Sequence, residues 1–377
     1  MLKYILLFIR KGKLMKNNHN LLMKMKNLEK FSGAIKRCVA IAMASMLFAT
    51  TGFSLDTHPV KAQEVSSSAD KIEIPEISKD AFKKYKKISG IGANTILGAD
   101  FTYYQQCLEW GKSYKNYMSQ SVDNIFDYVK SQGINTISLK VAVNPTGENA
   151  YLSLENAIKT LKAVKASNTN LKTNLVLLYS DEITYAGTQN LPADWEKAEK
   201  EEQSVTRVES AKTYTRETIA KLKQANVLPD IVTIGNEVNW NFLGITDGEG
   251  WEGWKAMGDI SALLKKEGVK NAVSIAAQPD AASVKYIVQK LGYASVDYDY
   301  IGVNVYPDNN TNSYIKSLKN EVESCAPDKQ LIVSNVEYER VNEANTANVY
   351  TQADSIYNLL EATIDVVCSL LGRQLKK

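Results

Sequence analysis

Short apolar runs rich in β-branched residues alternate with longer amphipathic stretches along the chain from about residue 90 onward. Runs such as 175–178 and 331–333 are continuously apolar, which is typical of strands covered on both faces. The longer stretches space their apolar residues along one face of a helix. The pattern predicts strands over 92–101, 134–143, 171–180, 231–237, 272–278, 300–307 and 331–338. It predicts helices near 121–132, 152–166, 204–225, 254–266, 282–291, 313–325 and 351–371.

Regular alternation of strand and helix predicts an α/β architecture built on a parallel sheet. No Gly-x-Gly-x-x-Gly sequence follows the first predicted strand and no P-loop is present, so no motif supports a nucleotide-binding fold. The length of 377 residues suits a (β/α)8 TIM barrel, which needs about 250 residues as one domain. Because seven strand–helix units are found, we expect the eighth strand to be missing from a barrel domain at 79–377.

The segment before the barrel has the pattern of a targeting signal. Lys36 and Arg37 precede an apolar run at 38–49, and small residues at Val60 and Ala62 suit a signal peptidase. The apolar run is too short to span a membrane as a helix, which takes roughly 20 residues. The alternative is a buried N-terminal helix. We therefore expect a doubtful extension at 1–33, a signal peptide at 34–62 and a linker at 63–78. The protein would be secreted or held in the cell envelope, with no membrane span after signal removal.

Charge is nearly balanced overall but unevenly placed. The chain has 45 Lys and Arg against 42 Asp and Glu, and residues 1–62 hold 11 of the basic and 2 of the acidic residues. The remaining chain is therefore mildly acidic, which argues against nucleic-acid binding. Both histidines, His19 and His58, also lie in this N-terminal stretch. Without it, the chain lacks Ser/His or Cys/His catalysis and imidazole zinc sites, so acid–base chemistry falls to carboxylates, Lys, Tyr or Cys.

Cysteine usage indicates no disulfide framework. Cys107, Cys325 and Cys368 remain after the signal, an odd number without metal-ligand spacing. We interpret them as small buried apolar residues, although one bridge is compatible with an exported protein.

Polar residues gather where the predicted strands end. In a parallel barrel these carboxyl ends and the loops after them form the active site. Tryptophans and tyrosines fall in or beside the same loops, which suits a sugar with an apolar face and a rim of hydroxyls. The polar residues are Asp100, Lys140, Asn144, Asp181, Asn236, Glu237, Gln278, Asn304, Tyr306, Asn335 and Glu337.

Glu237 is the sharpest candidate. It closes a buried strand that ends in Asn236-Glu237, where an enclosed site favours a general acid. The alternative is a surface loop that opens with this pair. Asn335 and Glu337 lie two residues apart, so they share one face of the last predicted strand. Glu337 could reach the cleft from there, or it could be a solvated residue beside Glu339.

An ordered set of motifs resembles the arabinogalactan endo-β-1,4-galactanases of glycoside hydrolase family 53. The resemblance runs from about residue 98 to 362 and is carried by the order of its motifs, since Asn-Glu alone is shared by many retaining glycosidases. The matching segments are Gly-Ala-Asp-Phe at 98–101, the strand at 134–141 with Asn144-Pro145, Tyr-Ser-Asp at 179–181 with Leu191-Pro192 and Trp195, the strand at 230–237, and 299–307.

The resemblance implies a retaining endo-glycosidase that acts on β-galactan or arabinogalactan as a monomer. Glu237 would be the acid/base and Glu337 the nucleophile, with carboxyl groups about 5–5.5 Å apart. Asn236 would bind the hydroxyl next to the anomeric carbon. No cofactor or metal is expected. The other expected substrate-binding residues are Asp100, Lys140, Asp181, Trp240, Asn304, Tyr306 and Asn335.

Departures from the family pattern weaken the inference to activity, and Leu178, Asn335 and the short C-terminus favour an alternative, a catalytically impaired galactan-binding protein on the same barrel. Lys140 stands where the family has Arg, so a planar fork is replaced by a point charge. Leu178 stands where the family has His. An ungapped alignment puts Asn335, not Glu337, at the nucleophile position. A two-lobed sugar-binding receptor fits poorly, because the chain forms one continuous β/α series.

Overall fold

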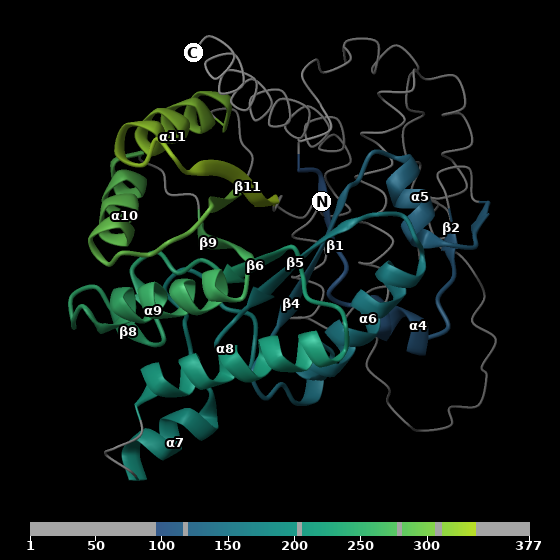
Figure 1. The fold of residues 1–377 in the computed structure, drawn as a ribbon, viewed down its shortest axis with the longest axis horizontal. Coiled ribbons are helices and arrows are strands. Elements are labelled where there is room, and N and C mark those ends of the chain that lie inside the picture. Colours follow the sequence, from purple (N-terminus) through teal and green to yellow (C-terminus); the bar gives the residue numbers. More distant parts are fainter. Residues whose placement is uncertain (1–95, 116–119, 202–205, 277–280, 306–310, 337–377) are drawn as a thin grey trace, which may run out of the picture.

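The computed structural model describes residues 96–115, 120–201, 206–276, 281–305 and 311–336. Seven strands form one parallel sheet whose spatial order follows the chain, as it does in a barrel (Figure 1). Every strand predicted from the sequence is found. Their bounds are β1 Gly98–Asp100, β4 Thr136–Val141, β5 Lys172–Leu177, β6 Ile231–Ile234, β9 Lys270–Ala276, β10 Tyr300–Val305 and β11 Gln330–Val336.

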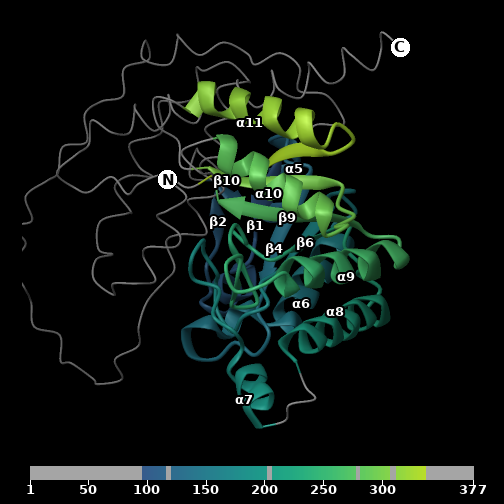
Figure 2. The same ribbon diagram turned by 90° about the vertical axis from the view of Figure 1, so that its left-hand side faces the viewer.

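Helices pack along the outer face of this curved sheet (Figures 1 and 2). Six of the seven predicted helices are found, and the predicted helix at 351–371 lies outside the described residues. Asn124, Ser153 and Thr206 cap three of them by accepting backbone N–H groups of the first turn. The bounds are α4 Tyr104–Glu109, α5 Ile125–Ser131, α6 Leu154–Ala166, α7 Ala193–Glu201, α8 Arg207–Gln224, α9 Glu252–Lys266, α10 Ala281–Tyr293 and α11 Thr311–Cys325, with a 3-10 helix η3 Gly147–Leu152.

The two faces of the sheet differ in polarity. Alternate residues such as Val232, Ile234 and Val273 point outward and join the main core with the helices. On the inner face, a small apolar layer of Ile231, Ala272 and Tyr300 lies near the start of the strands. Above it the inner face becomes polar: Asn174 Nδ2 donates to Ser138 Oγ over 3.0 Å, and Thr233 Oγ1 donates to Asn174 Oδ1 over 2.9 Å. Polar side chains therefore line the sheet toward the carboxyl ends of its strands.

Some elements differ from the sequence predictions. The fourth strand of the parallel sheet, β6, ends at Ile234 rather than at residue 237, because the chain turns sharply there. Two hairpins, β2 Tyr114–Lys115 with β3 Ser121–Val122 and β7 Asn241–Phe242 with β8 Ile245–Thr246, were not predicted. Helices α4 and α7 were not predicted either.

Several predictions concern residues outside the described part of the chain. These are the divisions at 1–33, 34–62 and 63–78 and the missing eighth strand. Cys107 is buried, as predicted, and Cys325 is half-buried; neither forms a disulfide within the described ranges, and Cys368 lies outside them. Within the described ranges, none of the helices has both the length and the apolar character needed to cross a membrane.

Candidate active site

Glu237 lies on a tight turn directly after β6. Gly235 has φ +69°, and a Cβ added there would lie 2.2 Å from Val238 Cγ1, so the turn requires glycine. Glu237 itself has φ +56°, a left-handed conformation that is unfavourable for a residue with a side chain. The turn is tied to both neighbouring strands, since the Gly235 N–H donates to the Leu177 carbonyl and the Val238 N–H to the Ser274 carbonyl, each over 2.9 Å. The backbone at Glu237 is therefore held by its neighbours.

The carboxylate of Glu237 is buried, with 2% of the residue exposed. Its Oε1 accepts a hydrogen bond from Asn304 Nδ2 over 2.8 Å. Its Oε2 accepts from the backbone N–H of Ala186 over 2.9 Å. Each oxygen is thus held by an N–H donor from a different element, which orients the whole group.

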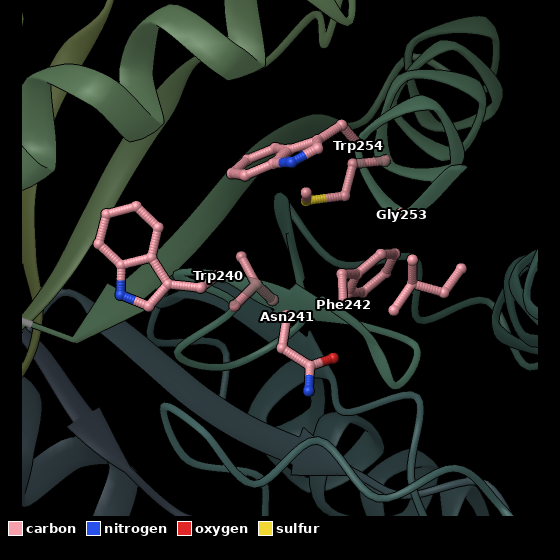
Figure 3. A pocket seen from close by; sticks show the side chains of 8 residues that line it. Trp240, Asn241, Phe242, Gly253 and Trp254 are labelled. Carbon is pink, nitrogen blue, oxygen red and sulfur yellow. The ribbon is translucent and has the colours of Figure 1, made fainter. Parts of the chain in front are cut away.

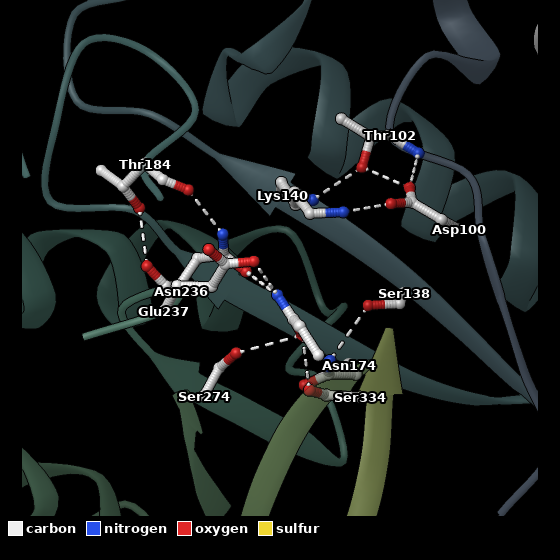
Figure 4. A network of polar contacts seen from close by, with 11 residues as sticks. Asp100, Thr102, Ser138, Lys140, Asn174, Thr184, Asn236, Glu237, Ser274 and Ser334 are labelled. Atoms are coloured by element: carbon white, nitrogen blue, oxygen red, sulfur yellow. Dashed lines mark hydrogen bonds and ion pairs between the residues drawn. The ribbon is translucent and has the colours of Figure 1, made fainter. Parts of the chain in front are cut away.

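Asn236 is fixed by the loop after β5. Its Nδ2 donates to the carbonyl of Thr184 over 2.6 Å, and Thr184 Oγ1 donates back to the Asn236 carbonyl over 3.0 Å (Figure 4). Gln189 Nε2 donates to the carbonyls of Asn236 and Glu237 over 2.9 and 3.2 Å. Sequence reasoning missed Thr184, Ala186 and Gln189, whose place in the loop after the third parallel strand is the signal that could have pointed to them.

Asn304 links Glu237 by hydrogen bonds to two further strands, β9 and β11. It lies on β10, is 1% exposed, and its Nδ2 also lies 3.3 Å from Asn236 Oδ1. Its Oδ1 accepts from Ser334 Oγ over 2.8 Å and from Ser274 Oγ over 3.4 Å. The register of β10 and β11 shifts at this point, from Val303 opposite Val333 to Asn304 opposite Asn335. The irregularity brings two residues of β11, Ser334 and Asn335, alongside Asn304.

Asp100 and Lys140, from β1 and β4, form an ion pair at the same end of the sheet (Figure 4). Thr102 Oγ1 donates to Asp100 Oδ1 over 2.5 Å and accepts from the Lys140 backbone N–H over 3.0 Å. Burial alone would raise the pKa of Asp100, but the charge and hydrogen bond of Lys140, with the hydrogen bonds from Thr102, lower the pKa overall. Both groups are therefore ionised, and each neutralises the charge of the other.

Asp181 joins the loop after β4 to the start of α7 by hydrogen bonds to their backbone. Its Oδ1 accepts from the backbone N–H of Asn144 over 2.9 Å, and its Oδ2 accepts from that of Ala193 over 3.0 Å. Both oxygens thus hold backbone at the loop after β4 and the start of α7. The predicted role of Asp181 in sugar binding stays a prediction, because this structure gives it a loop-ordering role as well.

Aromatic side chains stand beside the turn that carries Glu237. Trp240 is 37% exposed, and its ring centroid lies 5.6 Å from that of Tyr286 on α10. Figure 3 shows the Trp240 indole standing apart from Trp254 and Phe242, which line the same small pocket. Trp240 thus presents a partly exposed ring three residues after Glu237, and its predicted role as a sugar platform stays a prediction.

Asp247 fixes the surroundings of that ring. Its N–H donates to the Trp240 carbonyl over 2.7 Å, and its carboxylate accepts from Tyr286 Oη over 2.7 Å and from Trp254 Nε1 over 2.8 Å. Lys290 Nζ lies 3.3 Å from Asp247 Oδ1. Burial acts to raise the pKa of Asp247, but the hydrogen bonds from Tyr286, Trp254 and Lys290 lower it overall. The loop is therefore preorganised rather than loosely attached.

The structure brings together Glu237, Asn236 and Asn304, and it places Asn335 opposite Asn304. The predicted nucleophile Glu337 and the predicted ligand Tyr306 lie outside the described residues. In the described part of the chain, no cluster of three or more His, Cys, Asp or Glu side chains could hold a metal ion.

The family assignment rests on a direct comparison. Residues 96–370 match the model of Glycosyl hydrolase family 53. The chain belongs to this family. The matched segment contains all the described strands and the turn at Glu237, so the resemblance seen in the ordered motifs is confirmed.

Two galactanases are similar to this chain over part of their length. An arabinogalactan endo-β-1,4-galactanase from Cellvibrio japonicus is 29% identical over 58% of this chain and 59% of the relative. One from Thermothelomyces thermophilus is 28% identical over 62% of this chain and 70% of the relative. The chain therefore spans less than two thirds of the Cellvibrio protein's length.

Solved structures of the family share the fold. The GH53 catalytic domain of Ignisphaera aggregans has a TM-score of 0.63 at 19% identity and covers 75% of this chain and 84% of that one. A structure of fungal β-1,4-galactanases has a TM-score of 0.55 at 22% identity and covers 65% of this chain and 77% of that one. The predicted fold class, a (β/α) barrel with a parallel curved sheet, is confirmed.

Proposed function

We propose that this chain is a retaining endo-β-1,4-galactanase that hydrolyses the galactan or arabinogalactan side chains of plant cell-wall polysaccharide. The names of the relatives support the substrate class. The observation that carries the proposal is Glu237: a buried carboxylate after the fourth parallel strand, held by an N–H donor on each oxygen. Such a fixed group suits proton transfer, since general acid catalysis needs the donor within hydrogen-bond reach of the leaving oxygen.

In the proposed mechanism Glu237 protonates the glycosidic oxygen as the bond to the anomeric carbon breaks. Glu337 attacks that carbon and forms a glycosyl-enzyme, which water then hydrolyses while Glu237 accepts the water's proton. Asn236 is held in place by Thr184 and is proposed to bind the hydroxyl next to the anomeric carbon. No cofactor takes part in either step.

The proposed substrate contacts spread over the carboxyl ends of several strands. Trp240 offers an exposed indole face on which a pyranose ring can stack. The ion pair of Asp100 and Lys140 is proposed to contact sugar hydroxyls. We further propose that Asp181, Tyr306 and Asn335 line the subsites, that the protein acts as a monomer, and that it is exported.

A second candidate function is galactan binding without hydrolysis. The observation that favours it is the place of Asn335 opposite Asn304 in the sheet, because an ungapped alignment puts this asparagine at the family's nucleophile position. An amide cannot form the glycosyl-enzyme, so a chain that relies on Asn335 would bind its polysaccharide and leave it intact.

A set of variants assayed on β-1,4-galactan separates the two functions. For the enzyme, Glu237→Gln and Glu337→Gln should each lower hydrolysis by at least 100-fold, and azide should restore turnover of an activated galactoside by Glu337→Ala. Asn335→Gln keeps the amide and serves as the matched control. Galactan binding without release of reducing ends by the parent protein would instead support the binding function. Full hydrolysis by Glu337→Gln would remove that residue from the mechanism.

Export is tested separately. N-terminal sequencing of the protein recovered from outside the producing cell should begin at or near Gln63. Recovery with residues before Ala34 still attached would contradict the proposed signal peptide.

A further inference from the structure

We propose that Asn304 is the positioning residue of Glu237 and is not itself a sugar ligand. The proposal rests on the proposed function of Glu237 as the acid/base. Sequence position alone assigned Asn304 to the substrate, because it lies at the carboxyl end of a barrel strand. The hydrogen bonds in the structure give it a different role.

The side-chain amide of Asn304 has no capacity left for a sugar. A primary amide can donate two hydrogen bonds and accept two. Asn304 donates to Glu237 Oε1 at 2.8 Å and to Asn236 Oδ1 at 3.3 Å, and it accepts from Ser334 at 2.8 Å and Ser274 at 3.4 Å. With 1% of the residue exposed, a sugar hydroxyl would have to displace one of these partners.

The orientation of the amide follows from its partners. Glu237 Oε1 as a carboxylate oxygen can only accept, and Asn236 Oδ1 must accept because its Nδ2 already donates to Thr184. Asn304 must therefore present its NH2 group to both, which leaves its carbonyl oxygen for the two serine hydroxyls. A flipped amide would place two acceptor oxygens against each other.

The location of Asn304 suits a positioning role. Glu237 lies on a turn with φ +56°, whereas Asn304 lies within a fully buried strand, two strands away in the sheet order. Groups on strands are held more precisely than groups on loops. The register shift opposite Asn304 brings Ser334 to the amide oxygen. Asn304, on a rigid strand, thus fixes the position of the Glu237 carboxylate through one charge-assisted hydrogen bond.

A positioning role predicts a loss that depends on the leaving group. An aryl β-galactobioside with a dinitrophenolate leaving group needs no proton to depart, whereas a sugar or a simple phenol does. Asn304→Ala should therefore lower kcat/KM about 10- to 100-fold on galactan but only about 2-fold on the dinitrophenyl substrate. The quantity kcat/KM is used because it reports the step in which the leaving group departs.

Asn174→Ala is the matched control. Asn174 also lies on the inner face of the sheet and is hydrogen-bonded to Ser138 and Thr233, but these bonds lie in the layer below Glu237 (Figure 4). Asn174→Ala should lower kcat/KM by a similar factor on all substrates, whatever their leaving group. Ser334→Ala, which removes a donor to Asn304, should shift the leaving-group dependence in the direction of Asn304→Ala but less strongly.

Crystal structures of the two asparagine variants provide a readout that does not require activity. In Asn304→Ala the Glu237 carboxylate should rotate away from the Ala186 N–H, and in Asn174→Ala it should stay. A carboxylate unmoved in Asn304→Ala would overturn the proposal, and so would an equal loss on all leaving groups. Weaker galacto-oligosaccharide binding with an unchanged leaving-group dependence would make Asn304 a sugar ligand. A parent protein that cleaves neither substrate refutes the proposed function, while the crystal structures still decide the role of Asn304.

Discussion

Gly235 is the residue on which the turn at Glu237 depends, and Gly235→Ala should disrupt it. The new Cβ would lie 2.2 Å from Val238 Cγ1 and 3.3 Å from the Phe242 ring, at a φ of +69° that alanine rarely adopts. We expect the free energy of unfolding to fall by about 3 kcal/mol and hydrolysis to fall further, because Glu237 moves with the turn. Urea denaturation and a galactan assay measure the two effects.

Gly268→Ala is the control for that change. Gly268 has φ +74°, but no heavy atom lies within 4 Å of its added Cβ. It should lose about 1 kcal/mol, from the backbone conformation alone, and keep its activity. Equal losses of stability in the two variants would show that the contact with Val238 is relieved by small shifts.

The ion pair of Asp100 and Lys140 should stabilise the protein in a pH-dependent way. Lys140→Met leaves a largely buried carboxylate without its cation, and we expect a loss of about 2 kcal/mol at pH 7. Because the pKa of Asp100 is lowered in the folded protein, this difference is fully present above the usual aspartate pKa of about 4. It is lost as the pH falls through the lowered value.

Urea denaturation of both proteins at pH 7 and near pH 3 measures this difference. Lys197→Met removes an exposed pair with Glu201 at 4.0 Å and should change stability little at either pH. A Lys140→Met loss that stays constant down to the lowest pH at which the protein folds would show that packing, rather than charge, is what Lys140 contributes.

At the scale of elements, the alternation of apolar runs was enough to predict all seven parallel strands. Their ends were less predictable, because the left-handed turn from Gly235 to Glu237 ends β6 three residues early. The hairpin of β7 and β8 was missed for a related reason. Its two turn residues, Leu243 and Gly244, have φ of +58° and +68°, and leucine gives no turn signal. Leu243 is instead held there by burial, with 2% exposed.

Helix α7 has no buried residue and is held mainly by polar contacts, so Arg207→Met should loosen it. Arg207 Nε donates to Glu199 on α7 over 2.7 Å, and its Nη1 donates to the Leu243 carbonyl over 3.2 Å. The variant should exchange amide hydrogens at 193–201 at least 10-fold faster with little change in global stability. Lys200→Met removes an exposed pair with Glu196 and is the control. Unchanged exchange in Arg207→Met would mean that Trp195 packing alone holds the helix.

At the scale of the whole molecule, the convergence of parallel strands made the site predictable. Asn236 and Glu237 come after one strand and Asn304 lies on another, and the sheet brings them within hydrogen-bond distance. Their roles were less predictable, because a role depends on the partners a side chain finds. Asp181 accepts two backbone N–H groups, and Ala186 contributes only its backbone, so the residue types give no signal of these contacts beyond their place in the loop after β5.

Binding of galactan at this site should stabilise the entire fold. In the inactive variant Glu237→Gln, a β-1,4-galacto-oligosaccharide at 100 times its Kd should add about 2.7 kcal/mol, because it binds only the folded chain. Thermal unfolding should then show a rise in Tm of several degrees.

Trp240→Ala in the same background should need about 10-fold more sugar for the same rise, since an exposed indole at 37% is available for stacking. Tyr293→Ala, which removes a ring that is 75% exposed at the end of α10, should need no more. A β-1,4-gluco-oligosaccharide should give no rise, because its C4 oxygen, which carries the linkage, has the opposite orientation. Equal shifts with both sugars would mean that the site does not recognise galactose, and equal shifts with and without Trp240 would remove that residue from the binding surface.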